Sequence, residues 1–328
     1  MTKVSVIMPV LNEEHHLADA VQSVLDQNFD GELLLALGPS VDKTNEIAEL
    51  LAKQDNRVRL VPNPRGLTTV GMNLAIKEAK HDYIVRIDAH SEPQDDYIKH
   101  GVAILDEVGA DLIGGVMAAR GKTHFQKAVA YGYTSRIGLG GAKYHVGGEA
   151  GEAESAYLGI FRKSVLERVG GYDEGIIRGE DWELAQRIKA TGGLVWFSPE
   201  LRVTYWPRAT WVGLAKQFFS TGVWRGDLTR KDIRGASLRY FLPPFLLLAM
   251  ITSVIFLLTG NILGGIIPGL YILAILSNMG ATIPGGIAPQ AWFLPIVIPT
   301  MHFSWGWGFI VGFFRGAQGT LDRSRVTK

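Results

Sequence analysis

The chain has 328 residues, 47% of them hydrophobic, and its 33 Lys and Arg nearly balance its 32 Asp and Glu, giving a formal charge of +1. This composition excludes a disordered tail and a nucleic-acid-binding protein that relies on bulk positive charge. There is no cysteine, which excludes disulfides, thiolate nucleophiles and cysteine-ligated zinc.

Apolar, β-favouring runs alternate with segments of helical spacing in the first part of the chain. We predict strands at residues 4–10, 32–37, 57–61 and 83–87, and helices around residues 17–25, 47–51 and 68–79. Strands that alternate with helices form a mostly parallel sheet with helices on both faces and right-handed crossovers. The sequence therefore predicts an α/β, Rossmann-like domain.

The loop after the first strand lacks the usual phosphate-binding glycines. Pro9-Val10-Leu11-Asn12-Glu13 stands where a dinucleotide fold has G-x-G-x-x-G, and no G-x-x-x-x-G-K-[ST] occurs. A bound nucleotide would instead be held by side chains after the first two strands and by a metal at the fourth.

The fourth strand runs into Asp88-Ala89-His90. The carboxyl ends of strands in open α/β sheets bind ligands, and alternate residues of an extended chain point the same way, so Asp88 and His90 can converge on one divalent cation. On these residues alone, a turn aspartate beside a solvated histidine is an equal alternative.

Four motifs in order resemble the family 2 glycosyltransferases, which are inverting enzymes with the GT-A fold. They are Val4-Ser5-Val6-Ile7-Met8-Pro9-Val10-Leu11-Asn12-Glu13, Pro39-Ser40-Val41-Asp42-Lys43-Thr44, Asp88-Ala89-His90 at the DXD position, and Gly179-Glu180-Asp181-Trp182. The segments 135–144 and 301–309 are similar to membrane-anchored, succinoglycan-type transferases. The resemblance implies a nucleotide-sugar donor, a glycan or lipid-linked acceptor, a role in polysaccharide biosynthesis, and a divalent cation, Mn or Mg.

The resemblance also implies roles for individual residues. Asp181 would be the catalytic base, with Glu180 orienting the acceptor, and Asp88 and His90 would hold the metal. The Glu180-Asp181 pair lies at the N-terminus of a predicted helix whose Leu184 and Ile188 share one face. Helix capping is therefore the alternative role of this pair. The residues expected to bind the nucleotide sugar are Pro9, Leu11, Glu13, Asp42, Asp88 and Arg225, and those on the acceptor or product side are Gln217 and Trp224.

Three departures from the family pattern bear on these roles. Gly38 replaces a carboxylate that contacts the base in many relatives, which leaves Asp42 to bind ribose or to cap the next helix. His90 replaces the second aspartate of DXD and suits Mn²⁺ better than Mg²⁺. Gln217, Trp224 and Arg225 do not match the Q-x-x-R-W spacing of processive synthases, so we expect a transferase that adds one sugar and releases. For Arg225, a membrane-surface arginine is the alternative.

Residues 121–155 are rich in glycine and lack a clear period. We interpret them as a mobile loop on the acceptor side. Glu149, Glu152 and Glu154 within it are interpreted as solvated surface, without assigned roles.

Residues 240–314 contain no Asp, Glu, Lys or Arg, which predicts a helical membrane region. We divide the chain into a GT-A domain at residues 1–232 and a membrane-associated domain at 233–328. Apolar runs cover residues 241–258, 262–277 and 291–314, but basic residues on both sides require an even number of crossings. We expect two, with the Trp-rich third run at the interface and a multi-pass protein in the cell membrane whose catalytic domain is cytoplasmic. The basic residues are Arg225, Arg230, Lys231, Arg234, Arg239, Arg315, Arg323, Arg325 and Lys328.

The sequence thus predicts a metal-dependent inverting glycosyltransferase that does not bind nucleic acid. A sugar nucleotidyltransferase is a second hypothesis, but it would carry a Gly-rich, Arg-containing loop after the first strand. A non-catalytic membrane scaffold is a third, although Asp88, Glu180 and Asp181 are all present.

Overall fold

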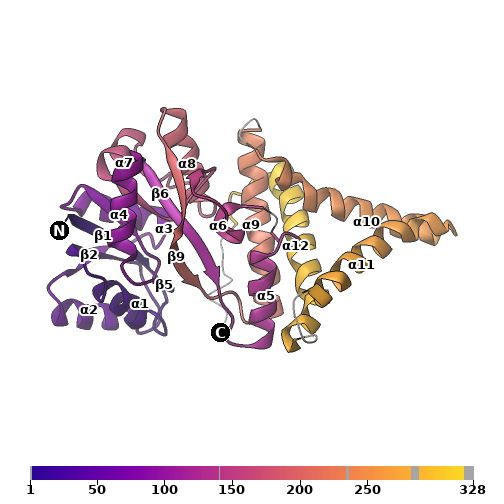
Figure 1. Ribbon diagram of the computed structural model, residues 1–328, viewed down its shortest axis with the longest axis horizontal. Coiled ribbons are helices and arrows are strands. Elements are labelled where there is room, and N and C mark those ends of the chain that lie inside the picture. Colours follow the sequence, from indigo (N-terminus) through magenta and orange to yellow (C-terminus); the bar gives the residue numbers. More distant parts are fainter. Residues whose placement is uncertain (1, 140, 234–235, 282–287, 321–328) are drawn as a thin grey trace. The chain divides into compact units, whose positions relative to one another are not determined.

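The computed structural model describes residues 2–139, 141–233, 236–281 and 288–320, and the chain forms two compact units (Figure 1). Unit 1 consists of Met1–Ala118 and Ala142–Tyr205, and unit 2 of Ala119–Gly141 and Trp206–Lys328. The predicted domain boundary after residue 232 stays a prediction. Five residues that the predictions from sequence include lie outside the described residues: Gly140, Arg234, Arg323, Arg325 and Lys328.

Unit 1 contains a sheet of nine strands. Its elements in chain order are β1 (Lys3–Val10), α1 (Leu17–Leu25), β2 (Asp30–Leu37), α2 (Thr44–Gln54), β3 (Val58–Pro62), α3 (Thr68–Glu78), β4 (Tyr83–Arg86), β5 (Ser91–Pro93), α4 (Tyr97–Val108), β6 (Leu112–Ala119), α6 (Lys143–Val146), β7 (Gly151–Glu152), β8 (Tyr157–Arg162), α7 (Lys163–Val169), α8 (Glu180–Ala190) and β9 (Val195–Tyr205).

The strand order is β3-β2-β1-β4-β8-β6-β9-β5, with β7 paired to β9. The first four strands are parallel, as predicted. Beyond β4, four pairings are antiparallel: β4 with β8, β8 with β6, and both β5 and β7 with β9. The carboxyl ends of β1, β2 and β4 therefore lie at one edge of the sheet.

Strand β1 is buried on both faces, which explains its continuous apolar run. Val4, Val6 and Met8 point into a core that α1, α2 and α4 cover, whereas Ile7 points into a second core covered by α3, α7 and α8. Helices on both faces fix the sheet, so the loops at its carboxyl edge stand on a rigid base.

Unit 2 is helical in the part that the structure describes. Its elements are α5 (His124–Thr134), α9 (Trp211–Lys231), η1 (Leu238–Phe241), α10 (Leu242–Leu258), η2 (Ile262–Gly265), α11 (Ile266–Ala281), η3 (Pro289–Phe293) and α12 (Leu294–Arg315). The interpretation of residues 121–155 as one mobile loop is wrong for α5. This helix begins with a capping box between Thr123 and Gln126, a local signal that the search for a hydrophobic period misses.

Helices α9 and α12 pack side by side in the same direction (Figure 1). Near their beginnings, Trp211 Nε1 donates to Thr300 Oγ1 at 2.7 Å. Further along, glycines of each helix face the backbone of the other: Gly222 and Gly226 meet α12, and Gly308 and Gly312 meet α9. The spacing of four residues on both helices permits this close approach.

Three segments of the described chain are long and apolar enough to cross a bilayer: Leu238–Leu258, Ile262–Met279 and Pro289–Arg315. The protein itself buries 11% and 17% of the most apolar window in the first two, but 39% in the third. The predicted apolar helical region is confirmed.

Candidate active site

The loops after β1 and β2 are joined by hydrogen bonds at the carboxyl edge of the sheet. The Asn12 backbone N donates to Ser40 Oγ at 3.0 Å, and the Glu13 backbone N donates to Thr44 Oγ1 at 2.7 Å. Asn12 is left-handed at φ 55, a conformation that asparagine adopts more readily than most residues. The side chains of Pro9 and Leu11 flank this junction, half-buried and exposed respectively.

Asp42 holds the same junction together. Its carboxylate accepts from Thr44 N at 3.0 Å, at the start of α2, and from Glu14 N at 3.3 Å. Burial raises the pKa of Asp42, but the hydrogen bonds with Thr44 and Glu14 outweigh burial and lower it. The lowered pKa keeps the Asp42 carboxylate ionised, and the carboxylate binds the first residue of α2, whose N-cap is Lys43. The predicted roles of Asp42 as a ribose ligand or a helix cap stay predictions.

Gly38 has little space around it. A Cβ at this position would lie 2.9 Å from Leu11 Cδ1 and 3.3 Å from the Val10 carbonyl oxygen. A side chain at this position would therefore require the exposed Leu11 side chain to move and the neighbouring backbone to shift by a few tenths of an ångström.

His90 is bonded to Glu13, with 3.0 Å between Nδ1 and Oε1. An ionised carboxylate only accepts hydrogen bonds, so the proton of a neutral His90 lies on Nδ1 and the lone pair on Nε2. Metal-binding histidines usually have such a carboxylate on the second ring nitrogen. Glu13, predicted to bind the nucleotide sugar, thus orients the imidazole in this structure.

The expectation that Asp88 and His90 alternate along one strand is wrong. Strand β4 ends at Arg86, and a turn follows in which Ser91 N donates to the Asp88 carbonyl at 2.9 Å. Alternation does bring Arg86 and Asp88 together, with 2.9 Å between Nε and Oδ1. After this turn the chain enters β5, which begins at Ser91.

Arg86 joins the carboxylates of two distant segments. Its side chain is only 4% exposed, and besides Asp88 it contacts Glu180 at 3.1 Å and Asp181 through Nη1. Burial alone would lower the pKa of Arg86, but the three carboxylates raise it. Three carboxylates share one guanidinium, so the cluster carries excess negative charge when all are ionised.

Glu180 and Asp181 begin helix α8, as predicted, and Gly179 precedes them in the left-handed conformation at φ 82. Burial, the largest effect, raises the pKa of Asp181 to about 7; Glu180 and Asp88 add to the rise and Arg86 opposes it. A carboxylate that titrates near neutral pH is suited to general-base chemistry.

The interpretation of Glu154 as solvated surface is wrong. Its carboxylate accepts from Trp182 Nε1 at 3.0 Å, and its carbonyl accepts from Gln186 Nε2 at 2.8 Å. Trp182 follows Asp181 directly and is buried. Glu154 therefore anchors the first turn of α8, a contact between residues far apart in sequence.

Asp88 and His90 offer a carboxylate and an imidazole, which are donor types that a cation such as Mn²⁺ accepts. The described residues contain no group of three or more acidic, His or Cys side chains placed around one metal position. Mg²⁺ and Mn²⁺ in nucleotide enzymes commonly take one or two carboxylates plus substrate phosphates. In such a site Asp88 would supply the carboxylate, and His90, oriented by Glu13, would supply an imidazole.

Gln217, Trp224 and Arg225 lie on α9 in unit 2. Gln217 and Trp224 are buried there, and Trp224 Nε1 donates to the Thr320 carbonyl at 3.3 Å. The Arg225 guanidinium lies 4.4 Å from the centre of the Tyr240 ring. Their predicted roles toward donor, acceptor or product stay predictions.

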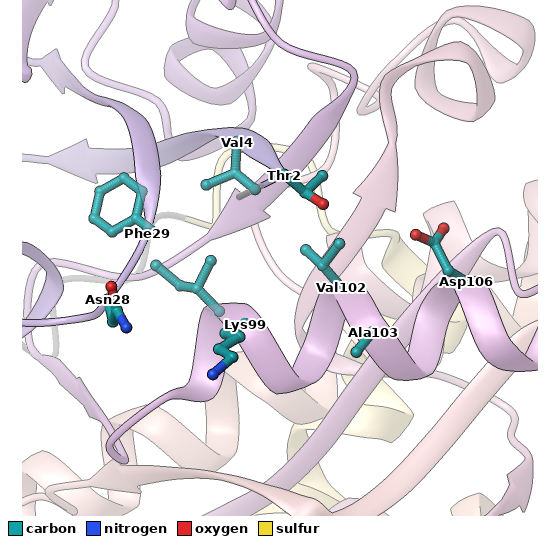
Figure 2. Close-up of a pocket in the computed structure, with 9 residues that line it drawn as sticks. Thr2, Val4, Asn28, Phe29, Lys99, Val102, Ala103 and Asp106 are labelled. Carbon is teal, nitrogen blue, oxygen red and sulfur yellow. The ribbon is translucent and has the colours of Figure 1, made fainter.

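A cavity of about 270 Å³ lies near the beginning of β1, at the end of the strand away from the cluster (Figure 2). Its lining includes the apolar Val4, Phe29 and Val102 and the charged Lys99 and Asp106. It holds none of the carboxylates described above, so it is not the candidate site.

Comparison with known proteins identifies the family. Residues 5–170 match the family model "Glycosyl transferase family 2", which spans β1, the two tied loops and Asp88. The chain belongs to the family 2 glycosyltransferases. It is 32% identical over 308 residues to "Succinoglycan biosynthesis protein ExoA" of Rhizobium meliloti (strain 1021), covering 93% of each chain.

One further relative and one solved structure match nearly the whole chain. A Methanococcus voltae protein is 24% identical over 327 residues, 96% of this chain and 98% of its own. Its name is "Dolichyl N-acetyl-alpha-D-glucosaminyl phosphate 3-beta-D-2,3-diacetamido-2,3-dideoxy-beta-D-glucuronosyltransferase". The solved mannosyltransferase PcManGT of Pyrobaculum calidifontis, in complex with GDP-Man and Mn²⁺, shares the fold with a TM-score of 0.59 at 17% identity, covering 94% of this chain and 86% of that one. The predicted GT-A fold and glycosyltransferase class are confirmed.

Sequence reasoning missed Arg86 and Glu154 as parts of the site. Arg86 had a signal: it is the one charged residue in the apolar run at residues 83–87, and a buried charge requires partners. Glu154 had none, because only the folded chain brings it to Trp182.

Proposed function

We propose that this glycosyltransferase is a metal-dependent inverting enzyme that moves one sugar from a nucleotide-sugar donor to a lipid-linked or membrane-proximal glycan. The observation that carries the proposal is the Arg86 cluster, which links a carboxylate at the end of β4 to two carboxylates at the start of α8. Inverting transfer requires stabilisation of the leaving group on one side and a base on the other.

In this proposal Asp181 accepts the proton of the acceptor hydroxyl while its oxygen attacks the anomeric carbon. The bond from that carbon to the diphosphate breaks, and the electron pair leaves with the diphosphate. Glu180 orients the acceptor, and Pro9, Leu11, Glu13 and Asp42 line the nucleotide side. A cation held by Asp88 and His90 would neutralise the leaving diphosphate.

Two observations support the proposal of a lipid-linked acceptor. The Methanococcus voltae relative is named for a dolichyl-phosphate-linked acceptor, and this chain carries apolar helices that are long enough to enter a bilayer. The relative named for succinoglycan biosynthesis supports a role in making a polysaccharide. We retain the expectation that the enzyme releases its product after one sugar, because Gln217, Trp224 and Arg225 depart from the Q-x-x-R-W spacing of processive synthases.

We also propose that α10 and α11 cross the membrane and that α12 lies along its cytoplasmic surface. Helix α9 packs along α12 and carries Lys216, Arg225 and Arg230, charges that are costly to bury in hydrocarbon. Within unit 2, α10 and α11 run across the direction of α9 and α12 (Figure 1). The two helix pairs therefore do not both align with the membrane normal.

The chemistry is tested with purified protein and a panel of UDP-glucose, UDP-galactose, UDP-N-acetylglucosamine and GDP-mannose, with membrane vesicles as acceptor. Asp181→Asn should lose ~10²-fold or more in turnover with donor binding retained. Asp88→Ala should lose both donor affinity and the response to Mn²⁺. Full activity in chelator, or near wild-type turnover of D181N, would contradict the proposal.

The topology is tested by placing single cysteines at Thr2 and Lys328 of this cysteine-free chain. In intact cells both should resist a membrane-impermeant thiol reagent until the membrane is permeabilised. Labelling of one end alone indicates an odd number of crossings, and labelling of both places the ends outside; either result overturns the topology.

A further inference from the structure

Arg86 is a charged residue in the interior of the sheet, and its burial calls for an explanation. The residue is 3% exposed, in a strand with β1 on one side and β8 on the other. A guanidinium is costly to remove from water unless its donors are paired. Its position next to the cluster of Asp88, Glu180 and Asp181 therefore suggests a purpose beyond packing.

The guanidinium meets each carboxylate with a different nitrogen. Nε lies 2.9 Å from Asp88, Nη2 lies 3.1 Å from Glu180, and Nη1 contacts Asp181. The three nitrogens are held in one rigid plane, so the guanidinium fixes the positions of the carboxylates relative to one another. The ring of buried Tyr172, whose centre is 6.0 Å from Cζ, lies beside this plane.

The carboxylates come from segments that local structure does not link. Asp88 belongs to the turn after β4, whereas Glu180 and Asp181 begin α8, some 94 and 95 positions from Arg86. This inference rests on the proposed function, in which Asp88 lies on the donor side of the reaction and Glu180 and Asp181 lie on the acceptor side. We propose that Arg86 is a positioning residue that holds the base Asp181 in register with the donor-side carboxylate Asp88.

Arg86→Lys is the informative change, because it keeps the charge but replaces the planar fork by a point charge. Arg59→Lys is a matched control: Arg59 lies on β3, and its Nη1 meets the buried carboxylate of Glu32 at 2.5 Å. Both variants exchange a strand arginine that pairs with buried acid, but only one touches the cluster.

We expect R86K to lose about tenfold or more in kcat for the nucleotide sugar of the panel that the wild type uses, in Mn²⁺ and with membrane vesicles. Its donor KM should stay close to that of R59K, and its melting temperature should stay above the assay temperature. The acid limb of its pH–rate profile should move to higher pH, because Asp181 loses part of its stabilising partner; a purely structural role would not move this limb. Turnover equal to that of R59K, with an unmoved acid limb, refutes the proposal.

If R86K fails to fold, the charge-balanced pair R86Q/E180Q decides, since one positive and one negative charge are removed together. Its turnover should lie about tenfold or more below that of E180Q, and equal turnover refutes the proposal. The proposed function fails separately: D181N with wild-type turnover removes the base assignment, whereas inactive D181N beside unaffected R86K removes only the role of Arg86.

Discussion

Gly308→Ala should destabilise the helical unit, because the added methyl group has no space. Its Cβ would lie 2.2 Å from the Phe219 carbonyl oxygen and 3.0 Å from the Val223 nitrogen. Non-bonded heavy atoms pack at about 3.5 Å, so α12 would have to move from α9 by about 1 Å. Gly222, Gly226 and Gly312 make similar approaches, so such a shift disturbs the whole contact.

The magnitude follows from comparison with a glycine that has space. Overpacking a well-packed contact costs about 1–3 kcal/mol, while Gly→Ala inside a helix otherwise gains up to ~1 kcal/mol. Gly269 in α11 has nothing within 4 Å of its Cβ position. Gly269→Ala shares the propensity gain without the clash, so the two variants should differ by about 1–3 kcal/mol.

The assay is thermal unfolding of both variants and the wild type in the same detergent. At roughly 2–4 °C per kcal/mol for a domain of moderate size, Gly308→Ala should melt several degrees below Gly269→Ala. Equal melting temperatures would show that α9 and α12 are not in close contact. The charges of α9 would then no longer argue that α12 lies at the membrane surface.

Three other predictions concern unit 1. Only ionised Asp181 accepts a proton, and its pKa is raised to about 7, so kcat/KM should rise with pH and reach half of its plateau near pH 7. A flat profile from about pH 5 to pH 8 would contradict the assignment of Asp181 as the base. Glu32→Ala removes the buried partner of Arg59 and Ser5 and should cost about 3 kcal/mol, against less than ~1 kcal/mol for the exposed Glu78→Ala. Burial raises the pKa of Glu32, but its hydrogen bonds outweigh burial and lower the pKa below the usual 4.5. The ionised Glu32 therefore stabilises the folded protein above pH 4.5, and this stabilisation is lost as the pH falls through the pKa of Glu32 in the folded state. Melting temperatures of the wild type and Glu32→Gln, compared in acid, will measure this loss. Glu154→Ala should lower turnover about tenfold, since Trp182 and α8 lose an anchor, whereas Glu149→Ala on the surface should leave turnover unchanged.

The amino-acid sequence by itself determined the elements that follow local patterns. Strand β1 reads as a strand because its residues are apolar on both faces, and both faces are buried. Helix α8 begins where the Glu180-Asp181 pair predicts it. The three apolar helices could be predicted from the sequence, because hydrophobicity and the absence of charge are properties of each segment alone.

The tertiary structure decided which side chains meet. Arg86 reaches Asp181 across 95 positions, and His90 reaches Glu13 across 77; no local period encodes such contacts, since they depend on how the strands are ordered in the sheet. The same holds for α9 and α12, whose glycines acquire meaning only when two backbones come into contact. Local chemistry names the candidate residues, and packing between distant segments selects their partners.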